Sequence, residues 1–313
     1  MCKVKIIKGL AFFSFLFFLL LAGSTMLLSL ISHGKNNQNV VSPLIQGIND
    51  HNNEVSSQFA SGLDEKIKSE LHKLTGSYSF VIINLTTGES YRHNPDRIYY
   101  SASLYKLWVM AVVFDQIEKG NLALETKLSS TIPRLNEEFN IASEEAELTE
   151  GEVSYSVEEA LEKAITISDN YAALLLTEKV GISKIKSFLQ QEKLSSSKVG
   201  SPPKTTAEDI SLFFLKLYRK EIIGEKNSEE MLGLLKRQAL NDRIPKYLPD
   251  EIAVAHKTGE LYGYKHDAGI IFTPSGDYIF VAMSETTNTS KAAEAIASIS
   301  LIAYEYFTTY ESK

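Results

Sequence analysis

The spacing of hydrophobic residues changes from a helical to a strand-like period early in the chain. From Leu63 to Leu74 apolar residues recur at helical intervals, which predicts an amphipathic helix. Two short runs rich in β-forming residues follow, at Tyr78–Asn84 and Glu89–Arg92. Because a Thr-Thr-Gly turn lies between these runs, they predict a β-hairpin.

A long helical block separates this hairpin from the remaining strands. The pattern predicts a helix over Ser103–Lys119 and a mostly helical stretch over Leu122–Phe214, with an acidic loop around Glu137–Glu152. Further helical patterns occur at Ala207–Arg219 and Ser228–Leu240. The block therefore forms a lobe between two groups of strands.

The strand-like period returns near the C-terminus. Three runs, at Ile252–Lys257, His266–Phe272 and Tyr278–Met283, precede a closing helical pattern at Lys291–Phe307. Two early and three late strands predict an α/β fold with one mixed antiparallel sheet, flanked by helices, the N- and C-terminal helices lying on one face. The central block is then an inserted all-helical lobe, and we expect the functional site in the seam between lobe and sheet.

The N-terminus carries a different pattern, a run of 24 uncharged residues at Gly9–Ser32. Such a run is long enough to cross a bilayer as a helix, and the preceding Lys3, Lys5 and Lys8 place the tail in the cytoplasm. We therefore expect a cytoplasmic tail (1–8), a single-pass anchor in the cell membrane (9–32), a polar tether (33–62) and an extracytoplasmic domain with the candidate chemistry (63–310). The alternative is a cleaved signal peptide, which would make the protein secreted.

Charge and composition limit the partners. The formal net charge is −7, and because residues 1–35 hold four lysines and no acid, the rest of the chain carries −11. This acidic excess argues against nucleic acid as a partner. The single cysteine, Cys2, excludes an intramolecular disulfide, and six histidines without close spacing give no metal site. No cofactor is expected, and the oligomeric state stays open.

Three short motifs carry the candidate chemistry: Ser103-Leu104-Tyr105-Lys106, Ser168-Asp169-Asn170 and Lys257-Thr258-Gly259. The S-x-x-K spacing of the first occurs five times in the chain and is uninformative alone. The two tripeptides are rarer, and the three motifs follow one another at a helix start, in a helical stretch and at a strand end. This combination indicates an acyl-transfer site that is assembled from three separate segments.

Ser103 is the candidate nucleophile. A serine hydroxyl is a weak nucleophile and needs a base beside it. Lys106 lies about one helical turn further on the same face, so its amine is within reach. Burial and the second cation at Lys257 both favour the neutral amine, which is the form that accepts a proton. At a helix start the N–H of Ser103 is also free to bind an oxyanion.

With these motifs the chain resembles, from about Leu63 to Tyr306, the class A β-lactamase-like branch of the penicillin-recognising serine enzymes. The resemblance implies a β-lactamase/transpeptidase-like fold, and β-lactams or the D-alanyl peptides of the cell wall as substrates. It implies a catalytic set of Ser103, Lys106, Ser168 and Lys257, in which Ser168 relays a proton to the leaving nitrogen.

The resemblance also implies roles for residues that bind the substrate. Asn170 would hold the substrate amide or Lys106, while Asp169 points away and ties its loop. Lys257 and Thr258 would bind a substrate carboxylate. Gly259 would leave space for the substrate backbone, and the N–H of Glu260 would complete the oxyanion hole.

One part of the class A pattern is missing. Those enzymes carry a glutamate after S-D-N, in an E-x-x-L-N context, that activates the deacylating water. No such motif lies between S-D-N and K-T-G in this chain, and the corresponding stretch 193–209 looks shortened. Glu192, Glu208 and Asp209 are the candidate substitutes. Without a placed base, an acyl-enzyme would form but hydrolyse slowly.

Two other functions remain open from the sequence. One is a D,D-peptidase that β-lactams merely acylate, and the other is a non-catalytic cell-wall-binding domain. A His/Asp triad built from His256 or from His266 and Asp267 is disfavoured, because no G-x-S-x-G elbow occurs in the chain. We expect these residues to be structural, and Lys265 is an additional candidate contact for a substrate carboxylate.

Overall fold

The computed structural model describes residues 55–309, with side chains from residue 62 onward. The predicted cytoplasmic tail and membrane anchor lie outside the described residues. Helix α1 (Val55–Leu71) begins before the predicted start at Leu63 and so includes the end of the predicted tether. Within residues 55–309, no helix combines the length and the apolar content that a membrane crossing requires.

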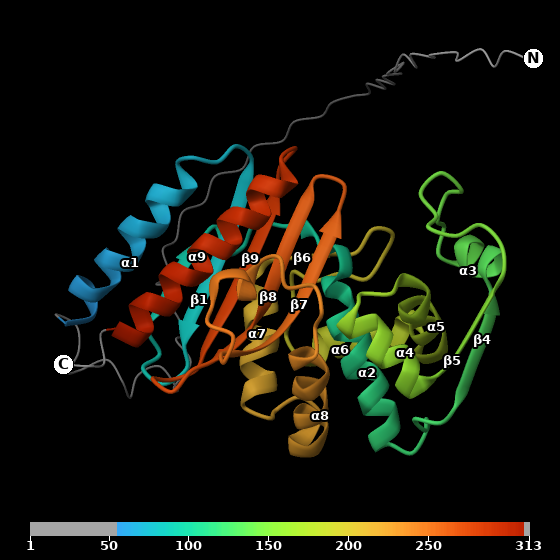
Figure 1. The fold of residues 1–313 in the computed structure, drawn as a ribbon. Coiled ribbons are helices and arrows are strands. Elements are labelled where there is room, and N and C mark those ends of the chain that lie inside the picture. The colour runs from blue at the N-terminus through green and yellow to red at the C-terminus, as the bar shows by residue number, and fades with distance from the viewer. Residues whose placement is uncertain (1–54, 310–313) are drawn as a thin grey trace, which may run out of the picture. The chain divides into compact units, whose positions relative to one another are not determined.

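One antiparallel sheet of five strands, in the order β2-β1-β9-β8-β7, lies at the centre of the fold (Figure 1). Its strands are β1 (Ser77–Asn84), β2 (Ser90–His93), β7 (Ala253–Leu261), β8 (Tyr264–Phe272) and β9 (Tyr278–Glu285). The early hairpin joins the late strands through β1 and β9, where Val81 lies opposite Val281. Strands from both ends of the described chain therefore share one sheet, which confirms the predicted fold class.

Helices cover both faces of this sheet. Helices α1 and α9 (Thr289–Thr309) lie side by side on one face, as predicted (Figure 1). Ile67 and Ile296 pack there with Phe80 and Phe280 of the sheet. The opposite face shares a second, larger hydrophobic core with the inserted lobe. The helices of that core and lobe are α2 (Lys106–Glu118), α3 (Ile132–Glu138), α4 (Val157–Thr166), α5 (Asn170–Val180), α6 (Ile182–Gln191), α7 (Ala207–Tyr218) and α8 (Gly224–Lys236).

The lobe is mainly helical, as expected, but it also contains a two-stranded antiparallel sheet that the hydrophobic pattern does not reveal. Strand β4 (Lys127–Thr131) pairs with β5 (Glu152–Ser156). The side chains of β4 alternate between exposed and buried, yet Leu128 is its single apolar residue. A strand with so little apolar contrast has no clear period-two signal.

Shorter elements connect the lobe to the sheet. Strands β3 (Tyr99–Tyr100) and β6 (Lys204–Thr205) pair with each other, which ties the segment before Ser103 to the end of the shortened stretch 193–209. A 3₁₀ turn, η2 (Ile244–Tyr247), precedes β7.

Strands β7 and β8 approach closely at Gly269. A Cβ added there would lie 2.4 Å from Ala255 O and 2.6 Å from His256 Cβ, which is closer than real Cβ contacts. Since β8 is buried along almost its whole length, it cannot move aside. Gly269→Ala is expected to lower the free energy of unfolding by about 1–3 kcal/mol or more, the usual cost of overpacking, measured by urea denaturation.

The control for this prediction is Gly62→Ala on α1, where an added Cβ meets nothing within 4 Å. Alanine is favoured over glycine in a helix, so the control should be neutral or slightly stabilising. An unchanged unfolding midpoint in Gly269→Ala would contradict the close approach of the two strands.

Candidate active site

Ser103 lies in a short 3₁₀ turn, η1 (Ala102–Tyr105), directly before α2. The pattern predicted a helix beginning at Ser103, whereas the α-helix begins at Lys106. Ala102 has a φ of 46°, in the left-handed region that non-glycine residues rarely adopt. Backbone strain of this kind clusters at functional sites, and here it directly precedes a serine that stays partly exposed.

Lys106 is almost completely buried, with 1% of its surface exposed. Its Nζ donates to Ser168 O at 2.6 Å and to Asn170 Oδ1 at 2.7 Å, and lies 3.3 Å from Ser168 Oγ. Burial lowers the pKa of Lys106 to about 7, opposed by the charges of Asp169 and Glu147. Near neutral pH much of the protein therefore holds a neutral amine, whose lone pair accepts a proton.

The S-D-N motif lies at the junction of α4 and α5 rather than inside a helix. Asp169 caps α5, because its carboxylate accepts the N–H of Ala172 at 2.8 Å. This confirms that Asp169 ties its own loop. Ser168 has a φ of 60°, a second left-handed residue in the site. The junction leaves Ser168 and Asn170 in contact with Lys106.

Lys257, in the middle of β7, is the second buried lysine, with no exposed surface. Its Nζ donates to Ser168 Oγ at 2.9 Å and to Thr258 O at 2.9 Å. Burial first, and then the positive charge of Lys106, hold the pKa of Lys257 well below its usual value. Ser168 Oγ thus lies between two amines, an arrangement suited to moving a proton.

Strand β7 packs against η1 at Gly259. A Cβ there would lie 3.1 Å from Ser101 O and 3.2 Å from Leu104 Cγ. The role of this glycine beside a substrate backbone stays a prediction, and in the structure the position of an added Cβ is next to the turn that carries Ser103. The absent side chain therefore lets the K-T-G strand and the S-x-x-K turn come together.

Gly259→Ala is expected to push η1 away by a few tenths of an ångström and to slow acylation by a penicillin roughly tenfold, since a 1 Å displacement of a reacting group can cost about a hundredfold. The rate of labelling by a fluorescent penicillin measures this effect. Gly233→Ala on α8 is the control, because its nearest neighbour lies 3.7 Å away. Equal rates in both variants would show that the approach of β7 to η1 does not position Ser103.

Arg243 is part of the site that sequence reasoning missed. It is 2% exposed, donates from Nη2 to Glu260 Oε2 at 2.7 Å, and helps to lower the pKa of Lys257. Lys265 donates to the same Glu260 oxygen at 2.5 Å. Arg243 belongs to none of the three motifs, and the 3₁₀ turn η2 separates it along the chain from β7, the strand that carries K-T-G. Thr258 is buried, with 2% of its surface exposed.

The structure does not show a hydrogen bond between every pair of predicted catalytic residues. Among the described residues, no hydrogen bond links Ser103 Oγ to either lysine amine. Catalytic hydrogen bonds of ligand-free enzymes are often long and shorten when substrate binds.

The histidines have structural contacts, as the sequence analysis expected. His256 Nδ1 lies 2.9 Å from Asp267 Oδ1 across β7 and β8. His266 Nε2 lies 2.9 Å from Tyr100 O, and its Nδ1 accepts the N–H of Ser284. Burial lowers the pKa of His266 to about 4, so this ring is neutral near pH 7.

The three candidate substitutes for the missing glutamate all bind residues outside the cluster. Their partners are Lys216 Nζ for Glu192 at 2.8 Å, Arg92 Nε for Glu208 at 3.2 Å, and Ser197 Oγ for Asp209 at 2.7 Å. Within residues 62–309, none of the three acids is hydrogen-bonded to Lys106, Ser168 or Lys257. These contacts therefore give no support to Glu192, Glu208 or Asp209 as the base that activates the deacylating water.

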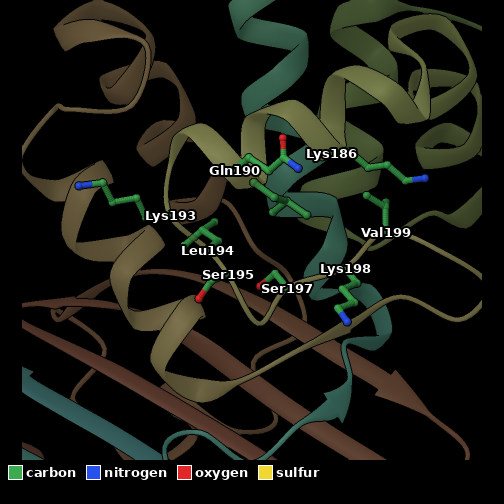
Figure 2. Close-up of a pocket in the computed structure, with 9 residues that line it drawn as sticks. Lys186, Gln190, Lys193, Leu194, Ser195, Ser197, Lys198 and Val199 are labelled. Carbon is green, nitrogen blue, oxygen red and sulfur yellow. The ribbon is translucent and has the colours of Figure 1, made fainter.

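Two hollows lie near the lobe. The larger, of about 630 Å³, is lined by α6 and the stretch 193–199, and Figure 2 shows no predicted site residue among its side chains. The smaller, of about 120 Å³, is lined in part by Tyr105, Glu147 and Asn170 and so adjoins the cluster. In the described part of the chain, no group of three His, Cys, Asp or Glu side chains is placed to hold a metal ion.

A partly exposed serine, two buried lysines and a shared hydroxyl on this fold define a class of protein, the serine hydrolases with a β-lactamase-like fold. A family model described as "Beta-lactamase enzyme family" matches residues 62–307. The chain belongs to this family, which confirms the resemblance found in the motifs.

Individual relatives are distant. "Beta-lactamase VEB-1" of Pseudomonas aeruginosa is 23% identical over 286 residues, 80% of this chain and 92% of that protein. The structure of PBP-A is 24% identical with a TM-score of 0.71, covering 79% of this chain and 96% of that one. A β-lactamase structure from Sphaerobacter thermophilus is 24% identical with a TM-score of 0.70, covering 80% and 98%. At such identity the two structures show the shared fold.

Proposed function

We propose that the protein hydrolyses β-lactams, or the D-alanyl cell-wall peptides that they resemble, through an acyl-enzyme at Ser103. The convergence of Lys106 and Lys257 on Ser168 Oγ, beside the turn that bears Ser103, carries this proposal. Acyl transfer from a nitrogen leaving group needs one group that accepts a proton and another that returns it, and this cluster holds both. A variant of the structurally similar PBP-A forms an acyl-enzyme complex with penicillin G, which supports the choice of ligand.

In the proposed acylation, Ser103 Oγ attacks the carbonyl carbon while its proton passes to neutral Lys106. The N–H groups of Ser103 and Glu260 bind the developing oxyanion. As the carbon–nitrogen bond breaks, Ser168 gives its proton to the nitrogen and regains one from the protonated Lys106, while Lys257 donates a hydrogen bond to its hydroxyl oxygen. This leaves an ester on Ser103.

The remaining binding roles of the proposal follow from the same cluster. Asn170 holds the substrate amide, and Lys257 with Thr258 attracts the substrate carboxylate.

A chromogenic cephalosporin tests the proposal. Steady colour formation beyond one equivalent of enzyme would support hydrolysis. A single burst of one equivalent would instead indicate a D,D-peptidase that is merely acylated. Absence of any covalent adduct in folded protein would contradict the proposal and favour a non-catalytic cell-wall-binding domain.

We also propose that the hydrolase domain works outside the cytoplasm, held by a membrane anchor at residues 9–32. The uncharged run and the three preceding lysines support this placement. Protease added to spheroplasts should remove the domain from the membrane fraction. Full protection of the domain in intact spheroplasts would contradict it.

A further inference from the structure

An ester on Ser103 turns over only if a base activates water beside it. A neutral water molecule is a poor nucleophile, and a positioned base typically contributes about 10²- to 10⁴-fold to such a step. Lys106 and Lys257 already handle the acylation proton in the proposed function, on which this inference rests. The acids in contact with the cluster are therefore the groups to examine.

Two acids act on Lys106 through their charges, Asp169 and Glu147. Asp169 is occupied as the cap of α5. Glu147 Oε1 accepts a hydrogen bond from Asn170 Nδ2 at 2.6 Å, and Asn170 Oδ1 accepts one from Lys106. Among the described residues, Glu147 is the one acid hydrogen-bonded to any of Lys106, Ser168, Asn170 and Lys257.

The loop that carries Glu147 is tied to the helix that carries Asn170. Leu148 N–H donates to Tyr171 Oη at 3.1 Å, and Asn136 Nδ2 donates to Leu148 O at 2.8 Å. The backbone next to Glu147 is thus held by α3 and α5. This loop is the acidic stretch that the sequence singled out without a function.

Space for water adjoins the carboxylate. The hollow of about 120 Å³ is lined in part by Glu145, Glu147, Asn170 and Tyr105, and of the two acids Glu147 is the one hydrogen-bonded to Asn170. Tyr105 lies in the same 3₁₀ turn as Ser103. A water molecule occupies about 30 Å³ of liquid and needs polar partners, which Glu147 and Asn170 provide. The hollow therefore has both the size and the lining that a hydrolytic water requires.

We propose that Glu147, reaching the site from the loop before S-D-N, is the general base for deacylation of Ser103. A water oxygen bonds to the ester carbon while one of its protons passes to the Glu147 carboxylate. The carbon–Oγ bond then breaks, Oγ receives that proton from Glu147 by way of the neutral Lys106 amine, and the carboxylic acid product leaves. Glu147 is then a carboxylate again, and Lys106 is again a neutral amine.

Glu147→Gln tests this proposal, because an amide oxygen still accepts from Asn170 but does not act as a base. Protein is acylated with benzylpenicillin, excess ligand is removed, and decay of the adduct is followed by intact-protein mass spectrometry. The variant should acylate within about threefold of the wild-type rate, and its adduct should decay on the order of a hundredfold more slowly. Glu144→Gln, the same charge change on an exposed residue of the same loop, should decay like wild type.

Equal adduct lifetimes in wild type and Glu147→Gln would overturn the assignment of the base while leaving acylation at Ser103 intact. Slow decay in Glu144→Gln as well would also overturn it, because the loss of loop charge would then be the cause. A wild-type protein that forms no adduct would instead refute the proposed function, and this inference with it.

Discussion

Ser103→Ala should abolish covalent labelling by a fluorescent penicillin, with the adduct falling below detection in a gel and in intact-protein mass spectra. The alanine has no oxygen to form the ester, and no neighbouring group replaces it, because Ser168 Oγ is held between two lysines. Since Ser103 is partly exposed and forms no hydrogen bond to those lysines, its loss should leave the fold unchanged.

Ser195→Ala is the matched control for this prediction. Ser195 also begins an S-x-x-K spacing, ending at Lys198, and it is exposed beside the larger hollow. Labelling of the control should equal that of wild type. Undiminished labelling of Ser103→Ala would prove the nucleophile wrong, and loss of labelling in Ser195→Ala would point to the other spacing.

Lys106→Ala should slow acylation by about 10²- to 10⁴-fold, the usual contribution of a positioned base. The same reasoning predicts the pH dependence of wild type. Because burial lowers the pKa of Lys106 to about 7, the neutral amine that accepts the serine proton increases as pH rises through that value. The labelling rate should therefore rise about tenfold from pH 6 to pH 8 and level off above.

This rise should be absent in Lys106→Ala and unchanged in Lys198→Ala, which removes an exposed lysine from the other spacing. Removing Lys106 leaves Ser168 O and Asn170 Oδ1 without a donor, so thermal melting should be recorded for each variant. A Lys106→Ala protein that melts normally and labels at the wild-type rate would show that another group is the base.

The linear pattern predicted the elements that carry strong periodic contrast. The hairpin of β1 and β2, the three late strands and the pairing of the terminal helices on one face all followed from the spacing of apolar residues. The two-stranded sheet of β4 and β5 did not, because Leu128 alone supplies apolar contrast in β4. The start of α2 at Lys106 was missed because a 3₁₀ turn has no distinct hydrophobic period.

The acid and the arginine next to the cluster, Glu147 and Arg243, were not predicted from the sequence. Glu192, Glu208 and Asp209 were chosen by their position in the sequence, yet each binds a residue elsewhere. Glu147 and Arg243 reach the site from loops that contain no motif. Their contacts depend on how separate segments pack, which spacing along a chain does not encode.

The amino-acid sequence alone determined the reactive groups: a serine with a lysine one turn away, an S-D-N tripeptide next to helical segments and a strand carrying K-T-G. These are local relations, fixed by the geometry of a helix, a turn and a strand. Only the tertiary structure decided that two buried amines share one hydroxyl, that Gly259 lets the nucleophile's turn approach, and that Glu147 binds Asn170. The reason is physical, since burial and long-range contact set the proton affinity of each group and the neighbours it can reach.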